Sequence, residues 1–354
     1  MTKGLPDPTF WKDRRVLLTG HTGFKGAWLA LWLAEMGARV TGLSLAPDTD
    51  PNLFDSAGVA SRVHSHIGDI RDATLVREIT NKAAPRVIIH MAAQALVRRS
   101  YREPADTFAS NVMGTVNVLD AARATNGLDA CLVITSDKVY ENDGGGTAFK
   151  ETARLGGHDP YSASKAAAEI VVASYRSSFF GDQKTRLATA RGGNVIGGGD
   201  FSEDRIVPDI WRAHQSDTPL TLRYPDATRP WQHVLDCLCG YLVYAEHLAK
   251  SSTEEPALNF GPREANGLAV RELVSAMQAA LGARTAWQQA AGPQPKEMPA
   301  LALSCEKAEQ TLGWHSRLDA RQAIDWTAAW YKSFAAGEQP AEITLDQIRR
   351  YADA

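Results

Sequence analysis

The chain has 354 residues, of which 44% are hydrophobic and 22% charged, and its formal net charge is −3 at pH 7. This is ordinary for a globular protein with one large α/β unit, or with a main domain and a smaller partner. The slight negative charge gives no reason to expect nucleic acid or an anionic membrane as partner. Without a long apolar run or a signal-peptide core, and without zinc-like spacing of its four cysteines, we expect a cytoplasmic protein with no metal site.

Short β-branched runs alternate with stretches of helical period in the first part of the chain. Six runs are predicted to be strands: Arg15–Thr19, Arg39–Leu45, Arg62–Ile67, Arg86–His90, Ala130–Thr135 and Arg186–Arg191. Continuously apolar strands joined by helices predict a parallel sheet covered on both faces, a Rossmann-type doubly wound α/β fold.

After about Gly192 this rhythm fails, and a smaller mixed α/β domain for substrate is expected. We assign residues 1–191, with expected returns near 233–262, to a dinucleotide-binding domain. Residues 192–232 and 263–354 then form a discontinuous substrate-binding domain. A helix is expected near Arg205–Gln215, and Ala257–Pro262 resembles a further strand, which can return to the main sheet.

The first strand leads into a glycine loop, RVLLTGHTGFKG, followed by an amphipathic helix. Gly20, Gly23 and Gly26 permit a tight turn and let backbone N–H groups approach a pyrophosphate at the helix N-terminus. The helix dipole favours negative charge there. A turn that merely requires glycine is the competing interpretation, but strand, loop and helix occur in the order that a dinucleotide site needs.

The end of the second strand lacks the residue that usually selects the nicotinamide cofactor. Neither an acid for NAD nor an arginine for the NADP phosphate is present, and Ser44 stands about where one is expected. The choice of cofactor therefore stays open on these residues. Asp69, which closes the third strand beside Ile70, can bind the adenine amino group or serve as an ordinary helix cap.

Tyr161 and Lys165 lie four residues apart at the start of a helix in DPYSASKAAAE, so they share one face. A neighbouring ammonium is expected to lower the pKa of the tyrosine toward working pH. The phenolate can then take a hydroxyl proton while a hydride leaves the same carbon for nicotinamide. An exposed helix pair is the alternative. Asn111 can anchor water or backbone beside the lysine, or be a polar residue in a helix contact.

A third group of polar residues ends a buried strand in LVITSDKVYEN. Ser136, Asp137 and Lys138 place a hydroxyl, a carboxylate and an ammonium side by side. Charged residues at a strand end either begin a solvated loop or react with a ligand.

Together, the glycine loop, HMAAQ (His90–Gln94), Asn111, Ser136 and the Tyr161–Lys165 pair resemble the extended short-chain dehydrogenase/reductase family that acts on sugar nucleotides. Five stretches are more specific: GHTGFKG, HMAAQALVRRSY, TSDKVYEN, GGHDPYSASKAAAE and RPWQHVLD. They are similar to the 4,6-dehydratases of that family, and among these to the members that act on CDP-glucose.

The resemblance runs from about Arg14 to about Tyr331 and implies NAD, a nucleotide-sugar substrate and a homodimer. Helices around Thr107–Asn126 and Tyr161–Phe180 would pack across the two-fold axis. The implied cofactor-binding residues are Gly20, Thr22, Gly23, Phe24, Gly26, Ser44, Asp69, Ile70, Ala92, Ala93, Asn111, Tyr161 and Lys165. The implied substrate-binding residues are Gln94, Arg99, Asn194, Arg205 and Arg229. The missing ribose acid departs from the broader family.

A dehydratase also needs a base at C5 of the hexose and an acid at the C6 oxygen, beside the hydride chemistry. We hypothesise that Asp137, kept protonated by burial, is the acid, and that Lys138 is either the base or an electrostatic stabiliser of the enolate. The related dTDP-glucose dehydratases have Asp-Glu where this chain has Asp-Lys. With Ser136, Tyr161 and Lys165, these residues form the expected catalytic set.

Two other functions remain open. A sugar-nucleotide 4-epimerase or reductase on the same fold has no water to eliminate, so it would not need Asp137 and Lys138. A nicotinamide-binding regulatory protein without catalysis would not need Tyr161 and Lys165 intact.

Overall fold

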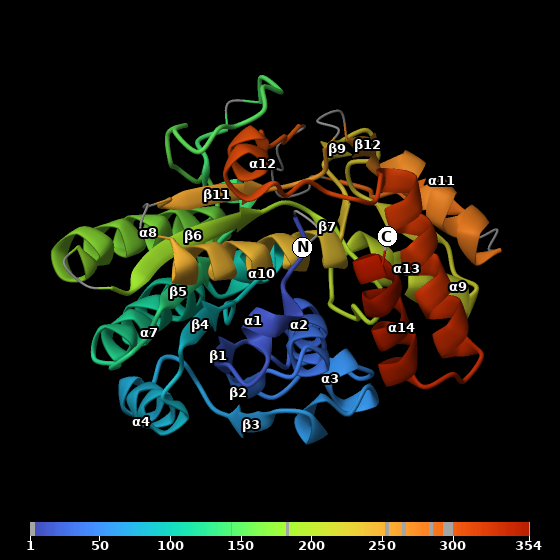
Figure 1. Cartoon of the computed structure of the whole chain (residues 1–354). Helices are drawn as coiled ribbons and strands as arrows, with labels where there is room; N and C mark the ends of the chain where they lie inside the picture. Colours follow the sequence, from blue (N-terminus) through green and yellow to red (C-terminus); the bar gives the residue numbers. More distant parts are fainter. Residues whose placement is uncertain are drawn as a thin grey trace.

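A computed structural model describes residues 4–142, 144–181, 184–251, 255–263, 267–282, 286–292 and 300–353. Its centre is a seven-stranded sheet in the order β11-β6-β5-β4-β1-β2-β3, with every neighbouring pair parallel (Figure 1). The strands are β1 Arg15–Thr19, β2 Arg39–Ser44, β3 His64–Ile67, β4 Val87–His90, β5 Ala130–Ile134, β6 Arg186–Gly192 and β11 Ala257–Phe260. The predicted doubly wound parallel sheet is confirmed, including the late strand that returns to it.

The main helices are α1 Pro8–Trp11, α2 Phe24–Glu35, α3 Leu53–Ser56, α4 Ala73–Ala83, α5 Val97–Arg102, α6 Pro104–Phe108, α7 Gly114–Arg123, α8 Pro160–Tyr175, α9 Ile206–Ser216, α10 Val234–Lys250, α11 Val270–Leu281, α12 Glu306–Leu312, α13 Ala320–Ala335 and α14 Pro340–Asp353. Shorter helical turns are η1 Val59–Ser61, η2 Ala109–Met113, η3 Asp137–Val139 and η4 Arg176–Phe180. Helices α4, α7 and α8 cover one face of the sheet, and α2 and α10 cover the other.

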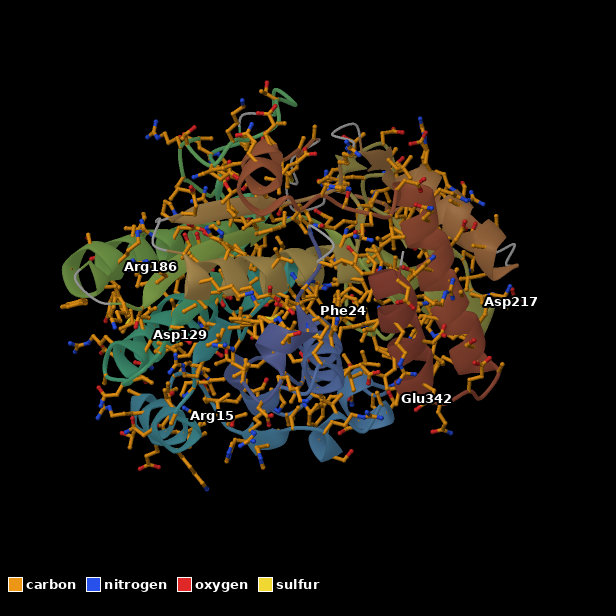
Figure 2. All side chains as sticks on the ribbon, in the orientation of Figure 1. Arg15, Phe24, Asp129, Arg186, Asp217 and Glu342 are labelled. Carbon is orange, nitrogen blue, oxygen red and sulfur yellow. The ribbon has the colours of Figure 1, made fainter. Side chains whose placement is uncertain are left out.

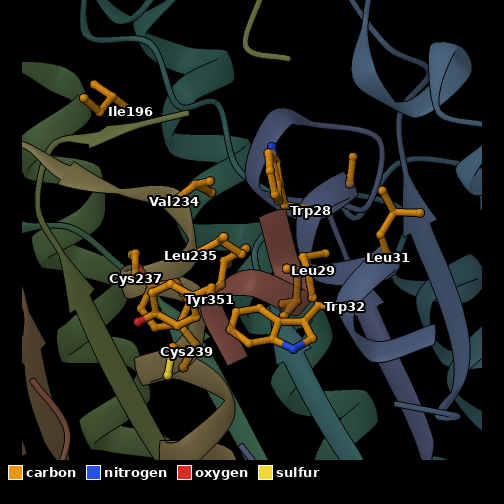
Figure 3. Packing of buried hydrophobic residues seen from close by; sticks show 14 of the residues in the cluster. Trp28, Leu29, Leu31, Trp32, Ile196, Val234, Leu235, Cys237, Cys239 and Tyr351 are labelled. Carbon is orange, nitrogen blue, oxygen red and sulfur yellow. The ribbon is translucent and has the colours of Figure 1, made fainter. Parts of the chain in front are cut away.

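Helix α2 is buried on all sides over most of its length, whereas the sequence predicts an amphipathic helix here. Every residue from 26 to 33 is buried. Trp28 donates from Nε1 to the carbonyl of Gly198, and the ring of Trp32 packs edge-on against Tyr351 of α14 at 5.7 Å. Figure 3 shows these side chains beside Leu235 of α10. The amphipathic prediction is wrong because α10 and α14, distant in sequence, cover the face that would otherwise meet solvent.

The rest of the chain builds a second region of small two-stranded sheets beside the carboxyl ends of the main strands. The strand pairs are β7 Val195–Ile196 with β10 Gln232–His233, β8 Leu220–Leu222 with β13 Trp287–Gln289, and β9 Thr228–Arg229 with β12 Leu268–Ala269. The helix expected near 205–215 is α9. Figure 2 shows Arg15 and Arg186, which begin β1 and β6, and Asp129, which precedes β5, on the side away from this region, and Phe24 nearer to it.

Candidate active site

A cavity of about 1500 Å³ opens at the carboxyl ends of β1, β2, β4 and β5 and reaches into the second region. Open α/β sheets bind ligands at this edge, where the strand order reverses. The cavity brings together twenty of the predicted site residues: Gly20, Thr22, Gly23, Phe24, Gly26, Ser44, Asp69, Ile70, Ala92, Ala93, Gln94, Arg99, Ser136, Asp137, Lys138, Tyr161, Lys165, Asn194, Arg205 and Arg229.

The glycine loop forms a close cradle that larger residues would fill. Gly20 has φ +82°, and a Cβ there would lie 2.7 Å from the backbone nitrogen of Ala92. A Cβ on Gly26 would lie 2.0 Å from the carbonyl oxygen of Gly20. Gly23 is the N-cap of α2 and offers no side-chain cap. The loop therefore presents backbone and the N-terminus of a 12-residue helix to the cavity, as a pyrophosphate requires.

The end of β2 carries hydroxyl groups, and the first carboxylate that lines the cavity after this strand lies in the loop that follows. The hydroxyls of Thr22 and Ser44 are 2.7 Å apart, and Thr22 Oγ1 donates to the carbonyl of Leu45 at 2.8 Å. Asp48, in the following loop, also lines the cavity. Sequence reasoning missed Asp48 because it inspected only the strand end.

Asp69 is not the cap of the helix that follows it. Its carboxylate accepts from the backbone N–H of Arg71 at 2.8 Å and from Nε of the same residue at 2.8 Å. The cap of α4 is Asp72, which accepts from the backbone of Thr74 and Leu75. Asp69 therefore lines the cavity with its place set by Arg71.

Tyr161 and Lys165 are both buried on one face of α8, as the spacing predicts. Lys165 Nζ donates to the carbonyl of Ile134 at 3.1 Å. Burial and, to a smaller extent, the charge of Lys25 lower the pKa of Lys165 to about 8, against the opposing charge of Glu169.

The expected lowering of the tyrosine pKa is wrong for the protein on its own. Burial raises the pKa of Tyr161 to about 12, although a hydrogen bond with Ser136 acts in the opposite direction. The reason is that the ammonium of Lys165 is directed to a strand carbonyl, so burial of the phenol dominates.

Ser136, Asp137 and Lys138 form a tight helical turn at the end of β5. Ser136 Oγ donates to Asp137 Oδ1 at 2.9 Å, and Lys138 Nζ lies 3.3 Å from the same oxygen. Asp137 is 1% exposed, so the interpretation of a solvated loop start is wrong for it. Its Oδ2 is buried and has no hydrogen-bond partner among the described residues. Lys138, whose side chain is 30% exposed, stays partly in solvent.

The predicted substrate residues differ in how far protein contacts already engage them. Asn194 Oδ1 is buried without a hydrogen-bond partner in the described part of the chain. Arg229 donates from Nη1 to the carbonyl of Thr228 at 2.8 Å. Gln94 is held by Thr107 and by the backbone of Leu96, so its amide supports the loop.

Arginines at the cavity meet carboxylates that the sequence reasoning did not single out. Arg99 pairs with Asp48 at 2.8 Å and with Glu203 at 3.1 Å. Arg205 pairs with Asp200 at 3.3 Å. A ligand diphosphate would therefore compete with carboxylates for these guanidinium groups.

Asn111 does not line the cavity. It is buried in η2, where its Oδ1 accepts from the backbone N–H of Gln94 at 2.9 Å and its Nδ2 donates to Ser164 Oγ at 2.8 Å. The side chain thus joins the loop after β4 to α8, as the helix-contact alternative describes.

No group of three or more potential metal ligands occurs within the described ranges. Among the same residues, no helix is long and apolar enough to cross a membrane.

Comparisons with known proteins match this chain to sugar-nucleotide dehydratases and to an epimerase of similar structure. The family model described as GDP-mannose 4,6 dehydratase matches residues 17–327. The CDP-glucose 4,6-dehydratase of Salmonella typhimurium is 40% identical over 98% of this chain and 99% of its own length. A structure of dTDP-glucose 4,6-dehydratase from Bacillus anthracis in complex with NAD has TM-score 0.77 and 20% identity, covering 93% of this chain and 99% of its own. An epimerase from Methanothermobacter thermautotrophicus reaches TM-score 0.80 at 20% identity, covering 93% and 95%.

Proposed function

Since this chain belongs to the GDP-mannose 4,6 dehydratase family, we propose that it converts CDP-D-glucose to CDP-4-dehydro-6-deoxy-D-glucose, with NAD as cofactor. The observation that carries the proposal is the buried Asp137 with its neighbour Lys138, in one cavity with Ser136, Tyr161 and Lys165. The 40% identity to a CDP-glucose 4,6-dehydratase supports the same base and sugar.

The cavity fits NAD on three observations. The glycine loop leaves room for a pyrophosphate, the N-terminus of α2 favours its charge, and the carboxylates of Asp48 and Asp69 line the same cavity, each paired with an arginine. When bound, NAD supplies the hydride acceptor for C4 and a positive charge that favours the phenolate of Tyr161. We assign cofactor binding to residues 1–191 with returns near 233–262, and substrate binding mainly to 192–232 and 263–354.

Oxidation at C4 depends on a proton acceptor for the C4 hydroxyl. Tyr161 takes this proton as the C4 hydride leaves. The Ser136 hydroxyl, which is hydrogen-bonded to Tyr161, positions the C4 oxygen of the substrate. Lys165 keeps a positive charge beside the new phenol. The resulting C4 ketone makes the C5 hydrogen acidic, because loss of that proton gives an enolate.

Elimination of water across C5–C6 then uses the pair at the end of β5. Lys138 takes the C5 proton, and Asp137 gives a proton to the C6 oxygen as the C6–O bond breaks and water leaves. The 3.3 Å contact between Lys138 Nζ and Asp137 Oδ1 can return the proton from the lysine to the carboxylate. Hydride is added back at C6, C5 takes a proton from solvent, and Tyr161 releases the proton that it took from the C4 hydroxyl, so the net change is the loss of one water.

We also propose a cytoplasmic homodimer. Exposed apolar side chains lie on the two helical segments expected at the two-fold axis: Met113 is 53% and Ile170 is 62% exposed, and Phe108 and Phe179 are exposed with them. Such residues mark a surface that a second copy can cover.

Incubation with CDP-glucose and NAD, followed by mass spectrometry and proton NMR, tests the function. Loss of the mass of one water, with a new C6 methyl doublet and no net NADH, is expected. An unchanged mass with inversion at C4 would instead identify a 4-epimerase. No turnover with any glucose nucleotide would favour a binding protein without catalysis.

A further inference from the structure

A buried ion pair lies behind Ser136, Asp137 and Lys138, and the proposed steps do not use it directly. Arg191, near the end of β6, donates from Nε to Glu169 Oε1 at 3.0 Å and from Nη2 to Glu169 Oε2 at 2.8 Å. The two side chains are 6% and 4% exposed. Two parallel bonds in the interior fix both partners in direction as well as in distance.

The carboxylate of Glu169 holds the residue that precedes the turn formed by residues 136–139. Its Oε1 also accepts from Thr135 Oγ1 at 2.5 Å, and its Oε2 accepts from Thr189 Oγ1 at 2.8 Å. Thr135 directly precedes Ser136. Both oxygens are therefore satisfied, as a buried carboxylate requires, and one of the bonds ends beside the catalytic hydroxyl.

The guanidinium of Arg191 holds the residue that follows the same turn. It donates from Nη1 to the phenol of Tyr140 at 2.9 Å, and that phenol donates to Asn259 Oδ1 at 2.6 Å. Tyr140 directly follows η3. One ion pair thus holds the chain on both sides of the turn formed by residues 136–139.

We propose that Glu169 and Arg191 are positioning residues, which set the 136–139 turn against Tyr161 and Lys165. The geometry gives the reason: Glu169 lies one helical turn after Lys165 on α8, so the pair ties the turn to the helix that carries both residues. The inference rests on the proposed function, because it assigns the turn a part in dehydration.

The charge of Glu169 adds a measurable consequence. Lys165 faces Lys25 of α2, His90 of β4 and its own helix neighbour Glu169, and it lies in the cavity with Asp137. Glu169 opposes the lowering of the Lys165 pKa by burial and by Lys25. Neutralising Glu169 therefore lowers that pKa further, so the ammonium loses its proton at lower pH.

Glu169→Gln tests the proposal, because it keeps the shape and removes the charge. The matched control is Asp236→Asn, a buried carboxylate on α10 that accepts from Tyr351 and the backbone of Arg317. With CDP-glucose and NAD, we expect Glu169→Gln to lower kcat by about 10²-fold with little change in KM, since small misplacements cost that much. The alkaline limb of the kcat–pH profile of Glu169→Gln should move to lower pH, and Glu169→Asp should recover part of kcat. The control should keep the wild-type pH profile.

Two results would overturn the inference: wild-type kcat and pH profile in Glu169→Gln, or an equal loss in the control with neither profile moved. A second readout does not need turnover. The Nζ resonance of Lys165, assigned with Lys165→Arg, should titrate at lower pH in Glu169→Gln than in the wild type, and an unchanged titration would contradict the charge argument. Failure of the wild type to dehydrate any sugar nucleotide would instead refute the proposed function.

Discussion

Two sets of ion pairs lie close to the catalytic residues, and they differ in burial. At the rear, the side chains of Glu169 and Arg191 are 4% and 6% exposed, and both ends are bonded to further buried groups. At the mouth, Arg99 is 28% exposed, while its partners Asp48 and Glu203 are 62% and 45% exposed. The rear pair is costly to break because an uncompensated buried charge remains. The mouth pairs exchange with water at little cost.

This difference separates two tasks. The rear pair holds fixed the atoms that take part in chemistry, whereas the mouth pairs can yield their guanidinium groups to a diphosphate. Variants at the rear should therefore change kcat and stability, and variants at the mouth should change KM. The following predictions run from the largest expected effect to the smallest.

Tyr161→Phe removes the proton acceptor for the C4 hydroxyl. We expect turnover of CDP-glucose to fall by about 10³-fold, within the range for a lost general base, while the substrate still binds. Product NMR and isothermal titration with CDP-glucose measure the two quantities. Wild-type turnover in this variant would remove Tyr161 from the chemistry.

Asp137→Asn keeps the size of the side chain but cannot donate an acid proton. Dehydration should fall by about 10²-fold, the lower part of the range for general acid catalysis. Oxidation at C4 should persist, so absorbance at 340 nm should rise on mixing with CDP-glucose and NAD. Unimpaired dehydration would contradict the acid role.

The pH dependence of stability follows from Lys165. Burial lowers its native pKa to about 8 from 10.5, so between these values the unfolded chain binds more protons than the native one. The contribution of Lys165 to the free energy of unfolding therefore rises with pH across this window. Urea unfolding at pH 8 and pH 10 should show a smaller rise for Lys165→Met than for the wild type. Equal rises would contradict the lowered pKa.

Glu203→Gln should have the smallest effect. It releases Arg99 and Arg102 from a shared carboxylate at the mouth, so KM for CDP-glucose should fall by about threefold, as expected for loss of a competing exposed pair worth under 1 kcal/mol. Unfolding free energy should change by less than about 1 kcal/mol. A stability loss as large as that of Glu169→Gln would erase the contrast between mouth and rear.

The sequence predicted what contiguous residues encode. The glycine loop, the Tyr161–Lys165 spacing and the run from Ser136 to Lys138 each lie in one stretch, and the strands around them carry a local apolar pattern. Their presence in one cavity follows from the rule that carboxyl ends of parallel strands meet at one edge.

What the sequence did not reveal depends on contacts between distant segments. The burial of α2 comes from α14, whose Arg349 reaches Glu35 across 314 residues. Glu169 lay inside a quoted motif, four residues after Lys165, yet its role becomes visible only when β6 brings Arg191 beside it. The raised pKa of Tyr161 likewise depends on the depth of burial, which spacing along a helix does not give.

The most direct test of the central claim is the fate of deuterium placed at C4 of CDP-glucose. A 4,6-dehydratase moves the label within the molecule, so the product should carry deuterium in the C6 methyl group and a solvent-derived hydrogen at C5. An epimerase would return the label to C4. Deuterium recovered at C4, with the C6 oxygen retained, would contradict the account.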